Sequence, residues 1–222
     1  MRCEDKNICR ECGGFCCKKS GCDYSPKDFK ELGIKAIIDI LDEGNVSIVS
    51  TFNYSVLPDG RKVPEFILYL RARNIDRGPV DLFSFKKQCS LLTEDGCSLD
   101  LNNRPFGGAN LVPVGLNPKT NLPDCYVDEN PLDIILSWSS YQNTLRKAVK
   151  RLTGNTVEKQ FELDVEEVFY QILMEDFDGI SKVEIADMLS GIKMLVEIYP
   201  EAYERAKARK RKNTCVLEIK RN

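Results

Sequence analysis

Histidine is missing from the 222-residue sequence. Its absence removes the most common general base and the imidazole metal ligand, and it excludes every hydrolase that depends on a serine, histidine and aspartate triad. A metal bound by this chain would therefore be held by thiolates, with carboxylate or water as the only common substitutes. All-sulfur sites suit zinc and iron–sulfur clusters and disfavour magnesium, calcium and manganese.

Long hydrophobic runs are also missing. The strongest apolar stretches, such as residues 67–70, fall far short of the roughly 18–20 residues that cross a bilayer. The opening residues 1–6 lack the apolar core of a secretion signal. We therefore expect a cytoplasmic protein without membrane contact, in a compartment that keeps thiols reduced. The formal net charge of −2 indicates no particular partner.

Cysteine, by contrast, is abundant at the start of the chain. The sequence contains ten cysteines, and six of them lie within the first 22 residues. Cys16 and Cys17 are neighbours, which do not readily form a disulfide because their Cβ atoms diverge. Cys9 and Cys12 form a Cys-x-x-Cys pair, a spacing that lets two sulfurs face one ion while backbone amides stabilise the thiolates. This density of thiols predicts a metal site.

The predicted ligands come from distant parts of the chain. One of Cys16 and Cys17 is expected to face the local site and the other to reach toward later cysteines, and the sequence does not say which is which. The predicted metal ligands are Cys9, Cys12, Cys16, Cys17, Cys89, Cys97 and Cys125. For Cys3 and Cys22 the sequence does not decide between a metal ligand and a thiol packed in the core, whereas Cys215 is expected to be a packed thiol.

Hydrophobic periodicity predicts an α+β protein. The expected helices cover residues 26–43, 132–152, 161–172 and 183–199, and the expected strands cover residues 46–52, 65–71, 111–114 and 215–219. Pro58, Asp59 and Gly60 predict a turn that joins the first two strands into a hairpin. Residues 99–127 are rich in Asn, Pro and Gly, and apart from one short strand we expect irregular backbone there.

The character of the sequence changes near residue 131. Residues 1–130 are predicted to form a cysteine-rich metal-binding domain with a small antiparallel sheet. Residues 131–222 are predicted to form a mainly helical part that packs on this domain. The helices of this part are also expected to offer a surface for a protein partner.

Charge is distributed unevenly in the helical part. Residues 158–204 hold thirteen acidic and three basic residues, whereas residues 205–212 hold six basic residues in eight positions. Pairs such as Glu201 with Arg205 are expected to neutralise the basic end within the chain. A nucleic-acid partner is therefore not favoured, although a basic run of this kind is also typical of nucleic-acid binding.

The cysteine motif and the residues after it resemble a known family. The residues concerned are Cys9-x-x-Cys12-x-Gly14-x-Cys16-Cys17-Lys18, Ser25-Pro26-x-Asp28, Cys89-Ser-Leu-Leu, Cys97-Ser98-Leu99 and Arg104-Pro105. This combination, within roughly the first 130 residues, is similar to the YkgJ-type cysteine cluster family, whose members are described as zinc- or iron-chelating domains. The resemblance implies metal chelation as the function and, for Arg104, a structural bond to the cluster loop.

The sequence departs from this family at one expected ligand. The family carries a cysteine shortly after the Arg-Pro step, and here that place reads Phe106-Gly107-Gly108. Cys125 is the candidate match for the family's late cysteine. Cys3 or Cys22 is the candidate replacement for the missing thiol.

Two alternative functions stay open. Flagellin lysine methylases carry a similar cysteine cluster, and this resemblance implies an iron–sulfur centre combined with methyl transfer. The sequence has no glycine-rich strand-to-helix loop that indicates S-adenosylmethionine binding, so Gly13–Gly14 and Gly107–Gly108 are interpreted as turn residues. The second alternative is a zinc-stabilised protein that binds nucleic acid through residues 205–212.

Overall fold

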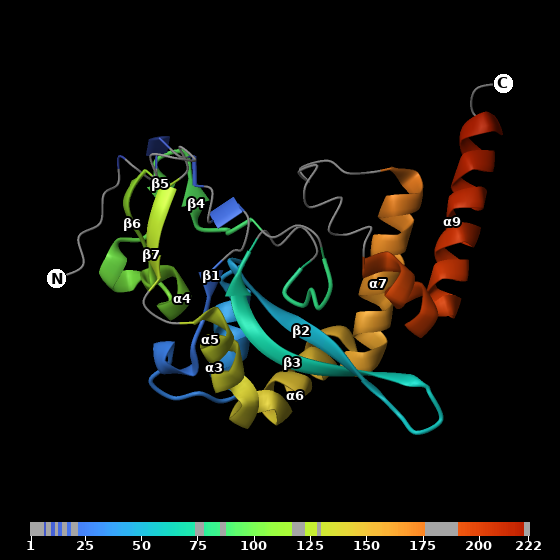
Figure 1. Ribbon diagram of the computed structural model, residues 1–222, viewed down its shortest axis with the longest axis horizontal. Coiled ribbons are helices and arrows are strands. Elements are labelled where there is room, and N and C mark those ends of the chain that lie inside the picture. Colours follow the sequence, from blue (N-terminus) through green and yellow to red (C-terminus); the bar gives the residue numbers. More distant parts are fainter. Residues whose placement is uncertain are drawn as a thin grey trace. The chain divides into compact units, whose positions relative to one another are not determined.

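Figure 1 shows the computed structural model of the protein. The structure describes residues 7, 10–11, 13–14, 17–18, 22–73, 78–84, 88–116, 123–127, 130–175 and 191–219. These residues form an α+β protein, as predicted, with a small antiparallel sheet and a helical C-terminal part. Helices in this described part are too short or too polar to span a bilayer.

The chain divides into two compact units. The first comprises Met1–Thr51, Ile67–Asp81 and Lys87–Gly154, and the second comprises Phe52–Phe66, Leu82–Lys86 and Asn155–Asn222. The first unit therefore extends past residue 130, where the sequence places a boundary. It does so because Trp138 is buried in this unit, where its indole Nε1 donates a hydrogen bond to the Tyr24 carbonyl oxygen at 2.7 Å.

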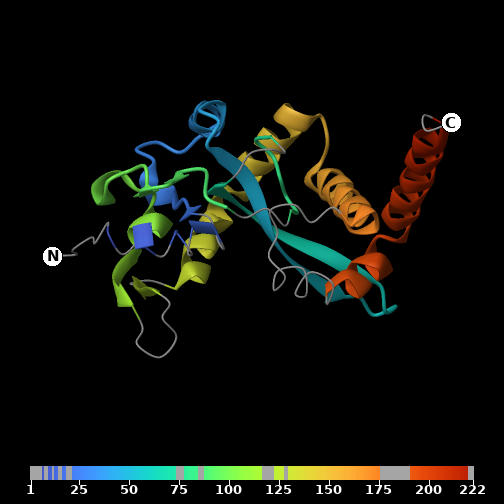
Figure 2. The same ribbon diagram turned by 90° about the horizontal axis from the view of Figure 1, so that it is seen from above.

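A three-stranded sheet has the strand order β1-β3-β2. Its strands are β1 (Cys22–Asp23), β2 (Val46–Val56) and β3 (Lys62–Ala72). The predicted hairpin is confirmed with longer strands than expected, and Figure 2 shows β2 and β3 running side by side. Gly60 occupies the turn with φ of 82°, a left-handed conformation that favours glycine. Short β1 pairs antiparallel with β3, which places Cys22 opposite Ala72.

The prediction of one continuous helix over residues 26–43 is wrong. A 3₁₀ turn, η1 (Pro26–Asp28), is followed by a separate α-helix, α3 (Ile34–Asp42). Gly33 is the N-cap of α3 with extended backbone, so the two elements do not join. Phe29 lies between them and packs edge-on against Trp138 at a ring distance of 6.1 Å. The apolar residue at helical spacing thus fills the core from an irregular segment.

The helix predicted over residues 132–152 is also interrupted. The structure has α5 (Pro131–Leu136), the 3₁₀ helix η3 (Ser137–Tyr141) and α6 (Gln142–Thr153) in its place. The change of path places Gln142 beside β3, where its side chain accepts from Leu68 N at 2.9 Å and donates to Leu68 O at 2.8 Å. Leu145 and Val149 on α6 are fully buried.

Several short elements lie within residues 92–127, which include the stretch 99–127 that was expected to be irregular. They are β4 (Leu92–Thr93), β5 (Gly96–Cys97), η2 (Leu101–Asn103), α4 (Phe106–Ala109), β6 (Leu111–Leu116) and β7 (Pro123–Val127). The predicted short strand is confirmed as β6, whereas its antiparallel partner β7 was not predicted. Helix α4 contacts both β1 and β6, which makes it the link between these strands.

The second unit is built on two long helices that lie side by side (Figure 1), α7 (Val157–Met174) and α9 (Pro200–Ile219). The predicted helix over residues 161–172 is confirmed as part of α7. The strand predicted at residues 215–219 is wrong, because α9 continues through it. Residues 183–190 of the helix predicted over residues 183–199 lie outside the described residues, and residues 191–198 are helical.

Aromatic rings form the core of the second unit. Phe161 on α7 is fully buried, and its ring lies 4.7–5.8 Å from four other aromatic rings. These rings belong to Phe52, Phe66, Phe83 and Tyr199. A second contact joins α7 to α9, where Phe169 meets Tyr203 edge-on.

Candidate metal centre

The predicted ligands differ in how far the structure describes them. Cys9, Cys12 and Cys16 lie outside the described residues, and so does the open candidate Cys3. The backbone of Cys125 lies on β7, but its side chain is not among the described ones. Cys17, Cys89 and Cys97 are described, together with the open candidate Cys22, and all four are free thiols.

Cys17 and Cys89 are brought together although they are far apart in the sequence. The backbone N–H of Cys89 donates to the Cys17 carbonyl oxygen at 2.7 Å. The side chains of Cys17 and Cys89 also interact by a hydrogen bond, and this bond, followed by burial, raises the pKa of Cys17. The two predicted ligands therefore meet through both their backbones and their sulfurs.

Cys22 belongs to the same cluster of side chains. It is buried together with Cys89 and Ala72, and Cys17, Tyr24, Leu91 and Leu92 pack against these three residues. Burial raises the pKa of Cys22, and the charges of Asp23, Cys17 and Cys97 act in the same direction. Cys97 lies on β5 opposite Leu92, so the β4–β5 hairpin approaches this cluster. The structure thus groups Cys17, Cys22 and Cys89 in one cluster, with Cys97 on the hairpin beside it.

Two glycines allow α4 to pack directly on β1. A Cβ atom built on Gly107 would lie 2.6 Å from the carbonyl oxygen of Asp23, and one built on Gly108 would lie 2.5 Å from the sulfur of Cys22. Neither distance is found for real side chains, so these positions require glycine. Their interpretation as turn residues is wrong, because both lie in α4 and neither has positive φ. The close approach of two elements explains them instead.

The other glycine pair is confirmed as a turn. Gly13 and Gly14 have φ of 64° and 72°, in the left-handed region where glycine is favoured. The carbonyl oxygen of Gly14 then accepts from Lys18 N at 2.9 Å. This turn lies just before Cys17 in the sequence.

Asp28 ties the segment after β1 to the start of α4. Its carboxylate accepts from Ser25 N at 2.8 Å and from Phe106 N at 3.1 Å. Burial raises the pKa of Asp28, and these two backbone N–H groups oppose that shift. Asp23 forms an ion pair with Arg71 on the neighbouring strand β3. These contacts position the segment that follows Cys22.

Arg104 lies next to the cysteine cluster. Its Nε donates to the carbonyl oxygen of Leu99 at 3.2 Å, which links it to the segment just after Cys97. Its positive charge acts to lower the pKa of Cys17, against the stronger effects that raise it. A guanidinium at this place stabilises negative charge on the neighbouring sulfur.

A complete ligand set is not formed by the described residues alone. Within them, no group of three or more cysteine, aspartate or glutamate side chains is arranged to hold a metal ion. A centre with the predicted ligands therefore also needs sulfurs from residues beyond this description, such as Cys9 and Cys12. Sequence reasoning left Cys22 undecided, and the small residues at 107–108 were the signal that a side chain from another segment occupies that space.

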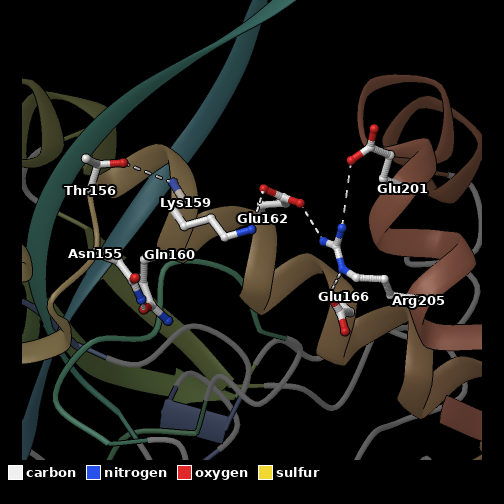
Figure 3. A network of polar contacts seen from close by, with 8 residues as sticks. All are labelled: Asn155, Thr156, Lys159, Gln160, Glu162, Glu166, Glu201 and Arg205. Atoms are coloured by element: carbon white, nitrogen blue, oxygen red, sulfur yellow. Dashed lines mark hydrogen bonds and ion pairs between the residues drawn. The ribbon is translucent and has the colours of Figure 1, made fainter.

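The basic run of α9 carries several ion pairs. Arg205 bonds to Glu162 and Glu166 of α7, and Figure 3 shows this guanidinium between the two helices. The predicted pair with Glu201 is present at 4.0 Å. Arg209 pairs in the same way with Glu167. These partners on α7 were not predicted, because sequence spacing indicates neighbours within one helix only.

Comparisons with known proteins place no constraint on this site. No protein-family model, no curated protein and no solved structure matches the chain. The interpretation of the cysteine cluster therefore depends on the residues of this chain and their arrangement.

Proposed function

We propose that this protein binds a metal centre, zinc or an iron–sulfur cluster, through its cysteines. The proposed ligands are Cys9, Cys12, Cys16 or Cys17, Cys89, Cys97 and Cys125. The resemblance of the motif to the YkgJ-type cysteine cluster family supports the same function. The metal is proposed to hold the cysteine-rich segments together, in a binding module of the reducing cytoplasm.

The observation that carries this proposal is the meeting of Cys17 with Cys89. A short N-terminal segment supplies one thiol, and a loop beyond the main sheet supplies the other. Two ionised thiols at hydrogen-bonding distance repel each other, and a cation between them removes that repulsion. Thiolate is also the ligand that zinc and iron–sulfur centres prefer. Arg104 adds a positive charge beside the same sulfurs.

The number of thiols argues against simple packing. A free cysteine often packs as a small hydrophobic residue. Six cysteines in 22 residues are more than the packing of a short segment requires. The strands near these cysteines are also short. Strand β1 carries Cys22, β5 carries Cys97 and β4 pairs with β5, and each of the three is only two residues long. Elements this short bury little apolar area, so a metal crosslink supplies stability that the core around them lacks.

The test is purification of the full chain without oxygen, followed by an absorption spectrum and elemental analysis. A brown protein that absorbs near 400 nm contains an iron–sulfur cluster, whereas a colourless protein with bound zinc contains a structural zinc site. Either result with a constant ratio of metal to protein supports the proposal. A reduced, folded protein that contains neither metal overturns it.

A matched pair of variants identifies the ligands. Cys89→Ser removes a proposed ligand, and Cys215→Ser removes a cysteine of α9 that is not among them. We expect Cys89→Ser to lose most of the bound metal and Cys215→Ser to keep the ratio of the unmodified protein. Equal metal content in both variants would remove Cys89 from the centre.

A further inference from the structure

We infer that Cys17 and Cys89 form an intramolecular disulfide when the metal-free protein meets a low-molecular-weight disulfide such as oxidised glutathione. The bond itself goes beyond the proposed metal site, because it requires only these two thiols. Its consequence for metal binding rests on the proposed function, in which Cys89 is a ligand. The arguments are the distance between the two residues, the way both are held and their different exposure.

The backbone hydrogen bond between the two residues limits how far apart their Cα atoms can lie. The N–H of Cys89 donates to the carbonyl oxygen of Cys17 at 2.7 Å. With standard bond lengths from these two atoms to their own Cα atoms, the Cα atoms lie at most about 6.6 Å apart. Disulfides join residues whose Cα atoms are about 4.4–6.8 Å apart. The backbone separation therefore meets the requirement for a disulfide.

The side chains of the two residues also meet. Cys89 is 3% exposed in a buried cluster, and the side chain of Cys17 packs against this cluster. Both residues are free thiols, and a hydrogen bond joins their side chains. In the described part of the chain, no further cysteine, aspartate or glutamate completes a metal site with them. The contact is therefore that of a pair of sulfurs, which is what a disulfide needs.

Hydrogen bonds hold the backbone around this contact. The peptide group after Cys17 is bonded at both ends, because its carbonyl oxygen accepts from Cys89 and its N–H donates to the Gly14 carbonyl oxygen at 2.9 Å. The Cys89 carbonyl oxygen accepts from Leu92 N at 3.2 Å. Residues that are already held in this way lose little further backbone freedom when their sulfurs bond. The disulfide therefore forms without a large rearrangement of either segment.

The difference in exposure sets the order of the reaction. Cys17 is half-buried, whereas Cys89 is buried, so Cys17 is the thiol that meets the oxidant. The thiolate of Cys17 attacks one sulfur of oxidised glutathione, which forms a mixed disulfide and releases one glutathione thiolate. The thiolate of Cys89 then attacks the Cys17 sulfur and releases the second glutathione thiolate. These two thiolates take up the protons that the cysteines lose, so two cysteine thiols are oxidised while one glutathione disulfide is reduced to two thiols.

The disulfide and the proposed metal centre exclude each other. A cysteine binds metal as a thiolate, and neither sulfur of a disulfide can take that form. Oxidation therefore removes Cys89 from the proposed ligand set, whichever of Cys16 and Cys17 belongs to it. Bound metal in turn occupies the thiolates that would attack the oxidant. The pair thus switches the site between a metal-binding state and an oxidised state.

The test uses the full chain, reduced, freed of metal with a chelator and kept without oxygen in mixtures of reduced and oxidised glutathione. The raised pKa of Cys17 slows thiol exchange, so incubation continues until the fraction of disulfide is constant. Free thiols are then blocked, and peptide mapping by mass spectrometry without reduction identifies the disulfides. We expect a bond between Cys17 and Cys89. If these two residues stay free, or bond only to other cysteines, at the highest proportion of oxidised glutathione, the inference is overturned.

A matched pair of variants checks the assignment. Cys17→Ser and Cys97→Ser each remove one half-buried thiol. We expect Cys17→Ser to lose the disulfide and Cys97→Ser to keep the disulfide content of the unmodified chain. Loss of the disulfide in Cys97→Ser and its retention in Cys17→Ser would assign the bond to Cys97 and overturn the inference. Peptide mapping of the unmodified chain decides the question by itself if a variant does not fold.

Addition of Zn²⁺ separates this inference from the proposed function. Zn²⁺ added before oxidised glutathione should prevent the disulfide, and the oxidised chain should lose the Zn²⁺ binding of the reduced chain. Equal binding of Zn²⁺ by both forms would overturn the exclusion. A disulfide in a chain whose reduced form binds no Zn²⁺ would support the bond and overturn a zinc centre. Binding of Zn²⁺ by a chain that never forms the disulfide would support the metal centre and overturn the inference.

Discussion

The cysteine-rich part of the first unit and the core of the second unit are stabilised in opposite ways. In the first, strands of two residues and a four-residue helix surround a cluster of free thiols. In the second, two long helices pack aromatic rings around the fully buried Phe161. One region has many potential ligands and little apolar area, whereas the other has a large apolar core.

The difference indicates which region would depend on the proposed metal centre. Burial of a large apolar side chain stabilises a protein by about 1.5–3 kcal/mol, so the aromatic cluster around Phe161 needs no further crosslink. Small domains without such a core are commonly held by disulfides or metals. The free thiols of the cysteine-rich part therefore fit a metal crosslink, and each prediction below tests one side of this comparison.

Removal of the metal is expected to have the largest effect. Structural zinc contributes about 10–16 kcal/mol of apparent binding free energy in small zinc domains, and this energy is lost when a chelator removes the ion. We expect the amides of residues 88–110 to lose protection in hydrogen-exchange mass spectrometry, while those of α7 remain protected. Equal loss of protection in both segments would contradict the comparison, and a chelator of calcium and magnesium serves as the control.

Truncation of Phe161 tests the other region. Phe161→Ala removes a fully buried ring that contacts four others, and such changes cost about 3–5 kcal/mol. We expect chemical denaturation to show this loss for the second unit, with an unchanged ratio of metal to protein. Phe161→Leu keeps most of the volume and should cost less than about 1.5 kcal/mol. A parallel loss of metal in Phe161→Ala would show that the two regions are not independent.

A smaller effect is expected from Asp28. Asp28→Ala leaves the N–H groups of Ser25 and Phe106 without their acceptor, which costs about 1–2 kcal/mol because the carboxylate is partly exposed. The loss should appear in the unfolding free energy of the first unit and should be smaller in Asp28→Asn, which retains one acceptor oxygen. Full stability of Asp28→Ala would mean that water replaces the carboxylate and that this link does not hold α4 in place.

The smallest effect concerns the ion pairs between α7 and α9. Burial raises the pKa of Glu162, but hydrogen bonds from Arg205 and Lys159 outweigh it and lower the pKa overall. The resulting stabilisation is therefore present at neutral pH, where the carboxylate of Glu162 is ionised. It is lost as the pH falls from the ordinary glutamate pKa of 4.5 to below the lowered pKa of Glu162, where the carboxylate becomes protonated. Because the pair is partly exposed, Arg205→Ala should cost at most about 1 kcal/mol at pH 7.

Melting temperature against pH measures this contribution. The difference between the unmodified chain and Arg205→Ala should shrink on acidification. Lys207→Ala is the matched control, since Lys207 pairs only with the exposed Glu204 of its own helix among the ion pairs that the structure describes. A difference that persists at pH 3 would mean that the Arg205 side chain acts through packing.

Helix α7 and the β2–β3 hairpin were predictable from sequence, whereas the longest helix, α9, was not among the expected helices. The apolar residues of α7 recur at helical spacing over five turns, and Pro58-Asp59-Gly60 indicates the hairpin turn directly. Periodicity failed where tertiary contacts interrupt a helix, as at Phe29, which leaves its expected helix to pack against Trp138. It also failed at residues 215–219, where local strand preference yields to the continuation of α9.

The candidate site was predictable in its chemistry and not in its assembly. The number of cysteines near the N-terminus and the absence of histidine indicate thiolate ligation. Sequence spacing gives no information on the contact of Cys17 with Cys89, because two segments far apart in the sequence form it. Gly107 and Gly108 were visible in the sequence, but only the approach of β1 to α4 shows why they must be glycine.

X-ray absorption at the edge of the metal found in the purified, reduced protein tests the central claim most directly, since it counts the atoms bound to that metal. Coordination by the cysteines predicts sulfur neighbours, at about 2.3 Å for zinc. A first shell of nitrogen and oxygen atoms alone would contradict thiolate ligation and leave the cysteine cluster as a set of packed, reduced thiols.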